Sequence, residues 1–275
     1  MRILSIILLG IIGLTSCSYK PVDVAVIKIK GSDTMKELTE NLAREYMEQH
    51  PGVSIYVDGG GTATGIRALI RGEVDICTAS RNLKPEEAKV LADYYGTLGI
   101  FFLVAKDALS IYLNPDNPVK KLSIEQLKNI FECKTVNWKE LGGNDQQIIP
   151  VIRNPNSGTH LYFREHILGG DDYCNNVVVE PTTRSVIKFI SEHSNAIGYG
   201  GMGYKGDIFD AKIEGIEPSV KNAQNDTYPI TRYLHFFTSK IPSGIVKDFI
   251  DWVLSPGGQK IVEDSGFIPL WEIPF

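Results

Sequence analysis

The chain has 275 residues, of which 43% are hydrophobic, and a formal net charge of −5 at pH 7. This apolar fraction is typical of a folded globular protein and excludes a chain that is disordered throughout. The acidic balance argues against nucleic acid as a partner, because nucleic-acid binding needs a basic surface. The length allows one large domain or two of ordinary size.

The first segment, residues 1–16, predicts a cleaved signal peptide. Arg2 precedes an apolar run at 3–14, which is too short to span a bilayer as a stable helix. The run ends in Leu-Thr-Ser-Cys17, which resembles a bacterial lipobox. We therefore expect lipidation of Cys17, a tether over residues 17–23, and a protein anchored on the extracytoplasmic side of a membrane. An ordinary signal peptide with a chance cysteine is the alternative.

The next stretch predicts a strand, a polar turn and a helix. Residues 24–30 alternate like a strand, and Gly-Ser-Asp-Thr at 31–34 leads into a helix with an apolar face over 35–49. Thr34 and Glu37 fit a capping box. In the alternative interpretation, Ser32, Thr34 and the first helical amides form a turn that faces an anion.

A second strand, turn and helix follow at residues 53–72. The turn Asp-Gly-Gly-Gly-Thr-Ala-Thr-Gly is not a P-loop, because Ile66 and Arg67 stand where Lys and Ser/Thr are needed. The hydroxyl of Thr62, beside Gly61, fits either a helix cap or an anion ligand. A third strand at 74–79 then ends at Ser80 and Arg81, and Pro85 begins another helix.

Residues 98–113 predict two strands around a short turn at Lys106-Asp107, and we interpret them as a crossing into a second domain. Ser123 and Gln126 form a capping box for a helix that reaches Phe131. A buried strand at 148–152 follows.

The segment at 153–160, Arg-Asn-Pro-Asn-Ser-Gly-Thr-His, has the strongest chemical signal. Ser157, Gly158 and Thr159 fall where a strand turns into a helix, so free amides and the helix dipole point outward. Arg153 adds a planar cation that stays charged. This combination suits an oxyanion, whereas the alternative is an ordinary capped helix with a surface arginine.

The remaining chain predicts a helix at 183–193, a strand at 195–203, a strand at 229–237, a helix at 243–254 and helical turns at 257–264. Gly198, Gly200 and Gly203 match a dinucleotide-binding pattern, but no helix follows directly, so we attribute the match to chance.

Little in the sequence supports catalysis. His160 and His166 are six residues apart, which does not place them on one helix face, and we expect no metal and no cofactor. Ser157 lacks a Gly-x-Ser-x-Gly elbow, although a serine hydrolase using His160 stays open as the enzymatic alternative. One disulfide, for example between Cys133 and Cys174, fits a cell-envelope compartment, but the sequence leaves it open.

Six motifs occur in an order that resembles the phosphate-binding lipoproteins of bacterial ATP-binding-cassette phosphate importers. They are Gly-Ser-Asp-Thr-Met at 31–35, Gly-Gly-Thr-Ala-Thr-Gly-Ile at 60–66, Gly-Glu-Val-Asp-Ile at 72–76 with Ala-Ser-Arg at 79–81, Arg153 with Ser-Gly-Thr at 157–159, Ala-Ile-Gly-Tyr at 196–199 and Tyr-Pro-Ile-Thr-Arg at 228–232. The resemblance covers nearly all of the mature chain. It implies a two-lobed α/β type II periplasmic-binding-protein fold, inorganic phosphate as ligand, a membrane permease as partner, a monomer and no enzymatic activity.

The resemblance also implies which residues bind phosphate. Thr34 and the amide of Met35 would bind from one lobe and Arg153, Ser157, Gly158 and Thr159 from the other. Thr62 stands where serine is usual. The full predicted set is Ser32, Thr34, Met35, Gly61, Thr62, Ser80, Arg81, Arg153, Ser157, Gly158 and Thr159.

Two departures from the family pattern concern ligand selectivity. Ser80 and Arg81 stand where many relatives have a carboxylate that accepts the phosphate proton, and Pro155 stands where an acidic residue is frequent. Another tetrahedral oxyanion such as sulfate therefore stays open as the ligand. A signalling or adhesion protein that uses its closed form as a partner surface is a further alternative.

We predict lobe I over residues 24–107 plus 201–275 and lobe II over 108–200. The crossing strands at 103–113 and 196–203 motivate these boundaries.

Overall fold

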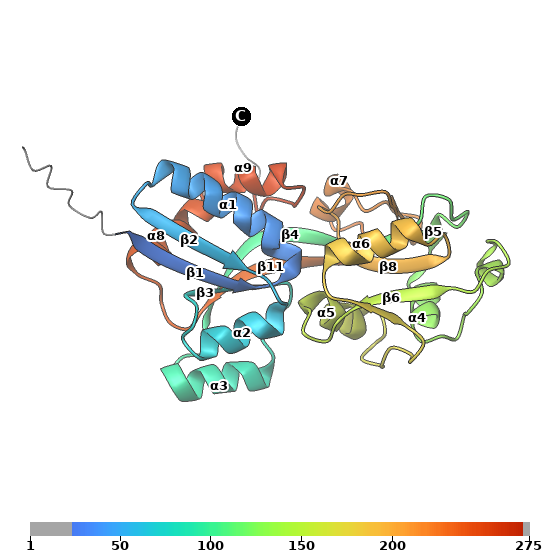
Figure 1. The fold of residues 1–275 in the computed structure, drawn as a ribbon, viewed down its shortest axis with the longest axis horizontal. Helices are drawn as coiled ribbons and strands as arrows, with labels where there is room; N and C mark the ends of the chain where they lie inside the picture. The colour runs from blue at the N-terminus through green and yellow to red at the C-terminus, as the bar shows by residue number, and fades with distance from the viewer. Residues whose placement is uncertain (1–23, 272–275) are drawn as a thin grey trace, which may run out of the picture.

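The computed structural model describes residues 24–271. Two α/β halves lie side by side along the long axis of the molecule, and two long strands, β4 (Ile100–Leu113) and β11 (Thr231–Thr238), run between them (Figure 1). The strands of both halves follow one path in the order β2-β1-β3-β11-β4-β8-β6-β7. Strand β4 therefore belongs to both halves, because β11 pairs with its first part and β8 with its second.

The first half is built on a mainly parallel sheet. Strand β1 (Ala25–Gly31) pairs in parallel with β2 (Val53–Asp58) and with β3 (Ile76–Ala79), and β11 joins β3 in the antiparallel direction. The predicted apolar face of the first helix is buried against this sheet. The helices of this half are α1 (Lys36–Gln49), α2 (Thr62–Ile70), α3 (Pro85–Tyr95), α8 (Gly244–Val253) and α9 (Pro256–Asp264), with the 3-10 turn η1 (Asp33–Met35) before α1.

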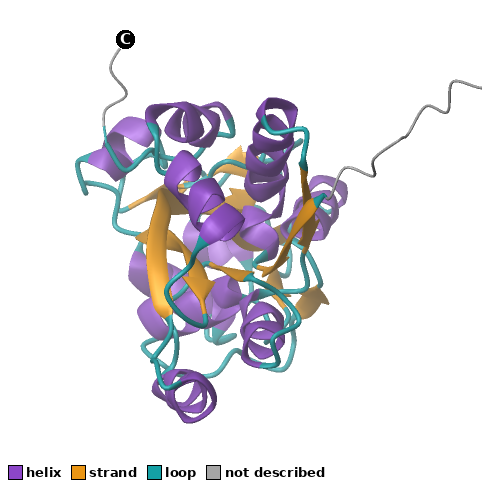
Figure 2. Ribbon diagram, turned by 90° about the vertical axis from the view of Figure 1, so that its left-hand side faces the viewer, coloured by secondary structure: helices purple, strands orange, loops and turns teal. Residues whose placement is uncertain are grey.

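The second half also places helices beside its strands (Figure 1). Figure 2 views the molecule along its long axis with the first half in front. Strand β8 (Ala196–Gly201) pairs with β4 in the antiparallel direction, and β6 (Ile149–Arg153) lies in parallel between β8 and β7 (Val178–Glu180). The other elements are α4 (Ile124–Phe131), η2 (Trp138–Leu141), α5 (Gly158–His166), α6 (Thr183–Glu192), α7 (Val220–Gln224), β5 (Lys121–Leu122), β9 (Phe209–Asp210) and β10 (Lys212–Ile213).

Separate apolar cores underlie the two halves. One core joins β1, α1 and α8 with the first part of β4, and another joins the second part of β4 with α4, α5 and β8. Ala211, Ala223 and Ile230 pack in the second core. The predicted division assigned these residues to lobe I, so the boundary at 201 differs from the packing. The chain returns to the first half only where β11 begins.

Strand β4 corrects the predicted turn at Lys106-Asp107. The strand continues without a break through both residues, because each charged side chain has a countercharge from a distant part of the chain. Lys106 pairs with Asp226, and Asp107 pairs with Arg232 on β11. A charged pair in the middle of an apolar run indicated a turn from local sequence alone, whereas burial with a paired countercharge is compatible with a central strand.

The structure confirms one of the two predicted capping boxes and not the other. The capping box at Ser123 is confirmed, since its hydroxyl accepts the amide of Gln126 and the Gln126 side chain accepts the amide of Ser123. The capping box at Thr34 is wrong: α1 begins after Met35 and has no side-chain cap. The hydroxyl of Thr34 is therefore available for another contact.

Cys133 and Cys174 form a disulfide, one of the pairings that the sequence left open, and it ties the end of α4 to the loop after α5. The predicted signal peptide and the lipidation residue Cys17 lie outside the described residues. Over 24–271, no helix is both long and apolar enough to cross a membrane.

Candidate functional site

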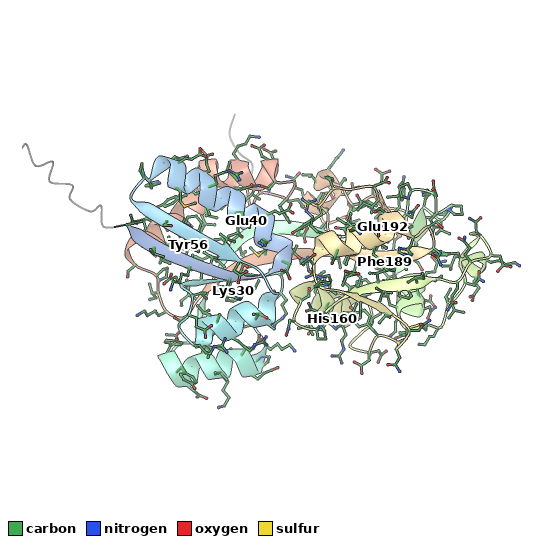
Figure 3. The ribbon with its side chains drawn as sticks, viewed as in Figure 1. Lys30, Glu40, Tyr56, His160, Phe189 and Glu192 are labelled. Atoms are coloured by element: carbon green, nitrogen blue, oxygen red, sulfur yellow. A yellow bond between two sulfur atoms is a disulfide. The ribbon has the colours of Figure 1, made fainter. Side chains whose placement is uncertain are left out.

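The strand-to-helix turns of the two halves meet where α2 approaches the start of α5 (Figure 1). The amide of Ala63 donates to the carbonyl of Asn156 at 3.1 Å, which joins the two turns directly. A Cβ atom on Gly61 would lie 2.5 Å from the same carbonyl, so only glycine allows this approach. Gly61 also has a φ of +91°, which side chains disfavour. Figure 3 places His160 on α5, on the side of the second half that faces α2.

A buried cluster of hydroxyls lies at this junction. Thr34 Oγ1 and Thr159 Oγ1, from opposite halves, are 2.9 Å apart. Thr62 Oγ1 accepts the amide of Ser80 at 3.2 Å. A Cβ on Gly158 would lie 2.5 Å from Thr62 Oγ1 and 2.6 Å from Ser80 Oγ. The structure thus brings together five of the predicted residues, and these five, Thr34, Thr62, Ser80, Gly158 and Thr159, are called the hydroxyl cluster below.

The start of α5 borders the other half through Gly158 and Thr159. Ser157 caps the helix, because its Oγ accepts the amides of Thr159 and His160 at 3.2 and 3.4 Å. The first amides of a helix have no partner within the helix, and the dipole makes this end partially positive. Ser157 keeps its own hydroxyl proton to donate. The local sequence therefore builds a helix start capped by Ser157, and that it binds an anion stays a prediction.

Arg153 is a fixed and almost fully buried cation at the end of β6. Its guanidinium donates to Asp33 at 2.8 Å, to Thr183 at 2.9 Å and to the carbonyl of Pro181 at 2.9 Å. Burial lowers the pKa of Arg153, and the carboxylate of Asp33 opposes this effect. Within residues 24–271, its buried Nε has no hydrogen-bond partner. The interpretation as a surface arginine is therefore wrong.

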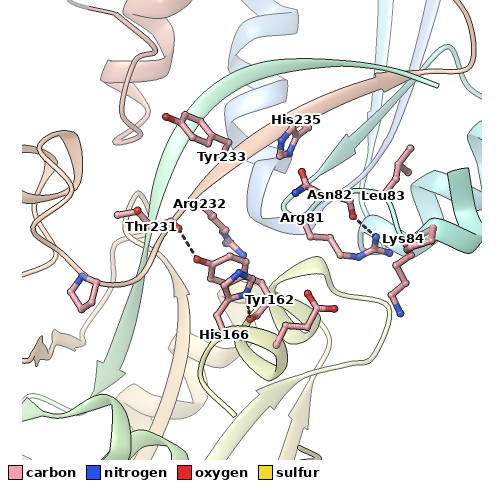
Figure 4. A pocket seen from close by; sticks show the side chains of 13 residues that line it. Arg81, Asn82, Leu83, Lys84, Tyr162, His166, Thr231, Arg232, Tyr233 and His235 are labelled. Carbon is pink, nitrogen blue, oxygen red and sulfur yellow. Dashed lines mark hydrogen bonds between the residues drawn. The ribbon is translucent and has the colours of Figure 1, made fainter. Parts of the chain in front are cut away.

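Three predicted residues have other partners. Arg81 donates to both carboxylate oxygens of Glu87 at 2.8 and 2.7 Å, away from the hydroxyl cluster. It lines a cleft of about 580 Å³ between α3, α5 and β11, which Arg232 also lines (Figure 4). The amide of Met35 donates to the carbonyl of Ser32 at 3.1 Å, and that of Gly61 to the carbonyl of Gly31 at 2.8 Å.

The sequence reasoning missed three charged residues beside the site. Asp33 lies within the motif at 31–35 and fixes Arg153. Arg232 lies within the motif at 228–232, and its Nη1 donates to Thr159 Oγ1 at 3.0 Å. Asp107 accepts Nε and Nη2 of Arg232 at 3.0 and 2.9 Å. The motifs could have indicated Asp33 and Arg232, but no local pattern points to Asp107.

The geometry does not assemble a hydrolase. His160 Nδ1 donates to the carbonyl of Arg153 at 2.7 Å, and burial lowers the pKa of this histidine. Ser157 Oγ accepts the amides of Thr159 and His160, and no hydrogen bond within the described residues joins it to the ring of His160. In the described part of the chain, no group of three His, Cys, Asp or Glu side chains is placed to hold a metal ion.

Comparisons with known proteins identify the family. A family model described as a PBP superfamily domain matches residues 20–256. The phosphate-binding protein PstS of Bacillus subtilis is 35% identical over 253 residues, which covers 90% of this chain and 81% of the relative. This chain belongs to the PstS family of phosphate-binding proteins. PstS of Pseudomonas aeruginosa is likewise 35% identical, over 87% of this chain and 81% of its own length.

A solved structure agrees with this assignment. A phosphate ABC transporter substrate-binding protein from Clostridium perfringens, solved with bound phosphate, superposes with a TM-score of 0.83 at 31% identity. The match covers 90% of this chain and 100% of that one. The fold of this PstS-family chain is therefore the two-lobed α/β fold of type II periplasmic binding proteins, as the sequence predicted.

Proposed function

We propose that the protein binds inorganic phosphate in the cleft between its lobes and delivers it to an ATP-binding-cassette importer. One observation carries the proposal: hydroxyls from both lobes meet at the start of α5 within contact of each other. Such a constellation offers several hydrogen-bond donors to one small anion and closes around it. The names of the PstS relatives and the phosphate-bound neighbour support the same ligand.

Three groups of donors have distinct roles in this proposal. Arg153 supplies positive charge and is held in place by Asp33. The amides at the start of α5 and the hydroxyls of Ser157 and Thr159 bind from lobe II, and Thr34, Thr62 and Ser80 bind from lobe I. Arg81 is left out of the proposed set, because Glu87 occupies its guanidinium.

We place the lobe boundaries at the two crossing strands. Lobe I comprises residues up to 107 and from 231 onward, and lobe II comprises residues 108–230. This division follows the two apolar cores, apart from Ile268, which packs in the core of lobe II. Contacts that cross it, such as Arg153 with Asp33 and Ala63 with Asn156, would break when the cleft opens to exchange ligand.

The proposed role also includes a place in the cell. The signal-like segment ending at Cys17 supports a lipid anchor on the extracytoplasmic side of a membrane, with the protein acting as a monomer. Mass spectrometry of the native N-terminus should find a diacylated or triacylated Cys17. An intact Met1 or an unmodified Cys17 would contradict the anchor and leave phosphate binding untouched.

The ligand is tested by isothermal titration of the ligand-stripped mature protein with phosphate, sulfate and molybdate. We expect the tightest binding for phosphate. Tighter binding of sulfate or molybdate at neutral pH would refute the phosphate assignment. Transport function without catalysis is tested alongside by ester turnover, which should be absent in the wild type and unchanged in Ser157→Ala.

A further inference from the structure

The strands of lobe I have one edge at the hydroxyl cluster and another at the outer end of the molecule. Strands β1, β2, β3 and β4 begin at the outer edge and β11 ends there, because β11 alone runs antiparallel to the others. The turns after β1, β2 and β3 carry the hydroxyl cluster at the opposite edge. The seven residues of β1 separate the two edges by roughly 20 Å. We call the outer edge, on the left of Figure 1, the pole of lobe I, and it comprises residues 24–26, 72–75, 97–99 and 239–242.

Four large apolar side chains are exposed at this pole. The exposed fractions are 78% for Ile241, 66% for Leu98, 47% for Val24 and 45% for Val26. Leu98 precedes β4 by two residues and Ile241 follows β11 by three, and the adjoining ends of these two strands pair with each other. Both side chains therefore lie just beyond the paired rows of the sheet, at the edge where β1 begins.

Contacts between the segments of the pole join them into one surface. Thr97 Oγ1 donates to the carbonyl of Ser239 at 2.6 Å, which fixes the segment before β4 to the loop after β11. A groove of about 360 Å³ continues from this loop to Val74 and Asp75, directly before β3. Asp75 Oδ2 in turn accepts the amide of Lys28 in β1 at 2.8 Å. The exposed apolar side chains thus belong to a continuous edge and are not scattered singly over the surface.

The charges of the pole fit a lipid headgroup region. Lys28 and Lys240 are exposed beside the apolar side chains. The nearby acidic side chains have partners, since Asp75 accepts the amide of Lys28 and Glu73 pairs with Arg71 at 2.7 Å. A lysine can extend its ammonium group to lipid phosphates while apolar neighbours lie deeper in the interface.

The length of chain before β1 favours a lipid surface over other partners. The tether of residues 17–23 reaches at most about 25 Å when fully extended. A protein anchored through Cys17 therefore holds its pole close to the bilayer, and the short tether gives a high effective concentration of the pole at the lipid surface. A second copy of the chain or a soluble protein has no such advantage.

We propose that the pole of lobe I rests on the phospholipid headgroups with Leu98 and Ile241 in the interface, an inference that rests on the lipid anchor proposed above. The length of β1 then places the hydroxyl cluster roughly 20 Å from the headgroups. Lobe II lies on the far side of the cleft from the pole (Figure 1). Lobe I is therefore the lobe that stays fixed on the membrane, and lobe II is the one that moves when the cleft opens.

The test uses the acylated mature protein on phosphatidylcholine vesicles that contain lipids with a quencher on the headgroup. In Ile241→Cys, the added thiol carries a fluorophore. Cys77 is buried and Cys133 and Cys174 form a disulfide, so the label should attach to the added thiol. Val136→Cys, in lobe II with a side chain that is 48% exposed, is the matched control. The Ile241 label should be quenched at least about twofold more than the Val136 label.

Two further substitutions test the apolar contact itself. Leu98→Asp should lower the quenching of the Ile241 label, because a charged side chain is unfavourable in the apolar part of the interface. Val220→Asp, at an exposed position of lobe II, should leave it unchanged.

Three outcomes would overturn the inference. Equal quenching of the two labels on acylated protein would show that the pole does not rest on the lipid. Energy transfer between donor- and acceptor-labelled copies at Ile241, without quenching by the lipid, would assign the pole to a second copy of the chain. Mass spectrometry that finds no acyl group on Cys17 would overturn the inference together with the anchor. Phosphate titration of the same preparation tests the proposed ligand separately, since the pole and the hydroxyl cluster lie at opposite edges of the sheet.

Discussion

Gly158 gives the sharpest test of how the two lobes meet. It is the first residue of α5, and an added Cβ would lie 2.5 Å from Thr62 Oγ1 and 2.6 Å from Ser80 Oγ, across the cleft. Distances this short require a displacement of the neighbouring groups. Both are short side chains on fixed elements, so Gly158→Ala should prevent the lobes from closing fully.

The size of the effect follows from where the strain appears. Overpacking by one methyl group typically costs about 1–3 kcal/mol. The strain is relieved when the cleft opens, because Gly158 and its two neighbours belong to different lobes. Gly158→Ala should therefore weaken phosphate binding roughly 5- to 150-fold while leaving the fold intact. Replacing a helical glycine by alanine should even raise the unfolding midpoint of the ligand-free protein by roughly 1–4 °C.

Gly257→Ala is the matched control. Gly257 also lies in the first turn of a helix, α9, and its added Cβ would meet only Ser255 Oγ at 3.7 Å. Titration calorimetry with phosphate and thermal unfolding without ligand should separate the two variants. Both should keep or gain stability, and only Gly158→Ala should lose affinity. Phosphate affinity within twofold of the wild type in Gly158→Ala would refute the reasoning.

Three further predictions concern stability and closure. Glu37→Gln removes an exposed ion pair with Arg184 that spans the lobes. Phosphate affinity should therefore fall less than about fivefold, and this loss should shrink as salt is added to the titration. A larger loss that does not depend on salt would contradict this prediction. Replacing Cys133 and Cys174 by serine opens a loop with a sequence separation of 41, which should lower stability by about 2–4 kcal/mol and the calorimetric midpoint by roughly 5–15 °C; an unchanged midpoint would show that the disulfide is not stabilising. Burial lowers the pKa of His235 to about 4, so this histidine binds a proton at higher pH in the unfolded chain than in the folded protein, and stability should decline as pH falls from about 6.5 to 4. In His235→Gln, the plot of unfolding midpoint against pH should be flatter over this range. An unchanged slope would disprove the contribution of His235.

The fold could be predicted largely from local signals. Alternating apolar residues gave the strands, and the spacing of Leu38, Leu42 and Tyr46 gave the buried face of α1. The errors arose where local sequence and tertiary context disagree. Lys106 and Asp107 indicated a turn but lie within β4, because partners far along the chain neutralise them. Thr34 indicated a helix cap but contacts Thr159, from a motif 125 residues away.

The segment at 153–159 and Arg81 show which parts of the candidate site can be predicted from local sequence. The segment at 153–159 contains its own helix start, cap and cation, so its chemistry could be deduced without a structure. Arg81 shows the opposite case, since it neighbours the site in sequence but pairs with Glu87 on the next helix. Sequence proximity to a motif does not determine where a long, flexible side chain points.

The sequence by itself therefore determined most strands and helices and the turns suited to an oxyanion, because strand periodicity, glycine-rich turns and helix starts are properties of short segments. The two-lobed fold and phosphate were implied by the resemblance of the motifs to a known family. Only the tertiary structure decided which groups share the cleft. Asp33 meets Arg153 and Asp107 meets Arg232 through contacts between residues 120 and 125 positions apart. The physical reason is that a buried charge must be paired, and the fold, not the neighbouring sequence, brings its partner within reach.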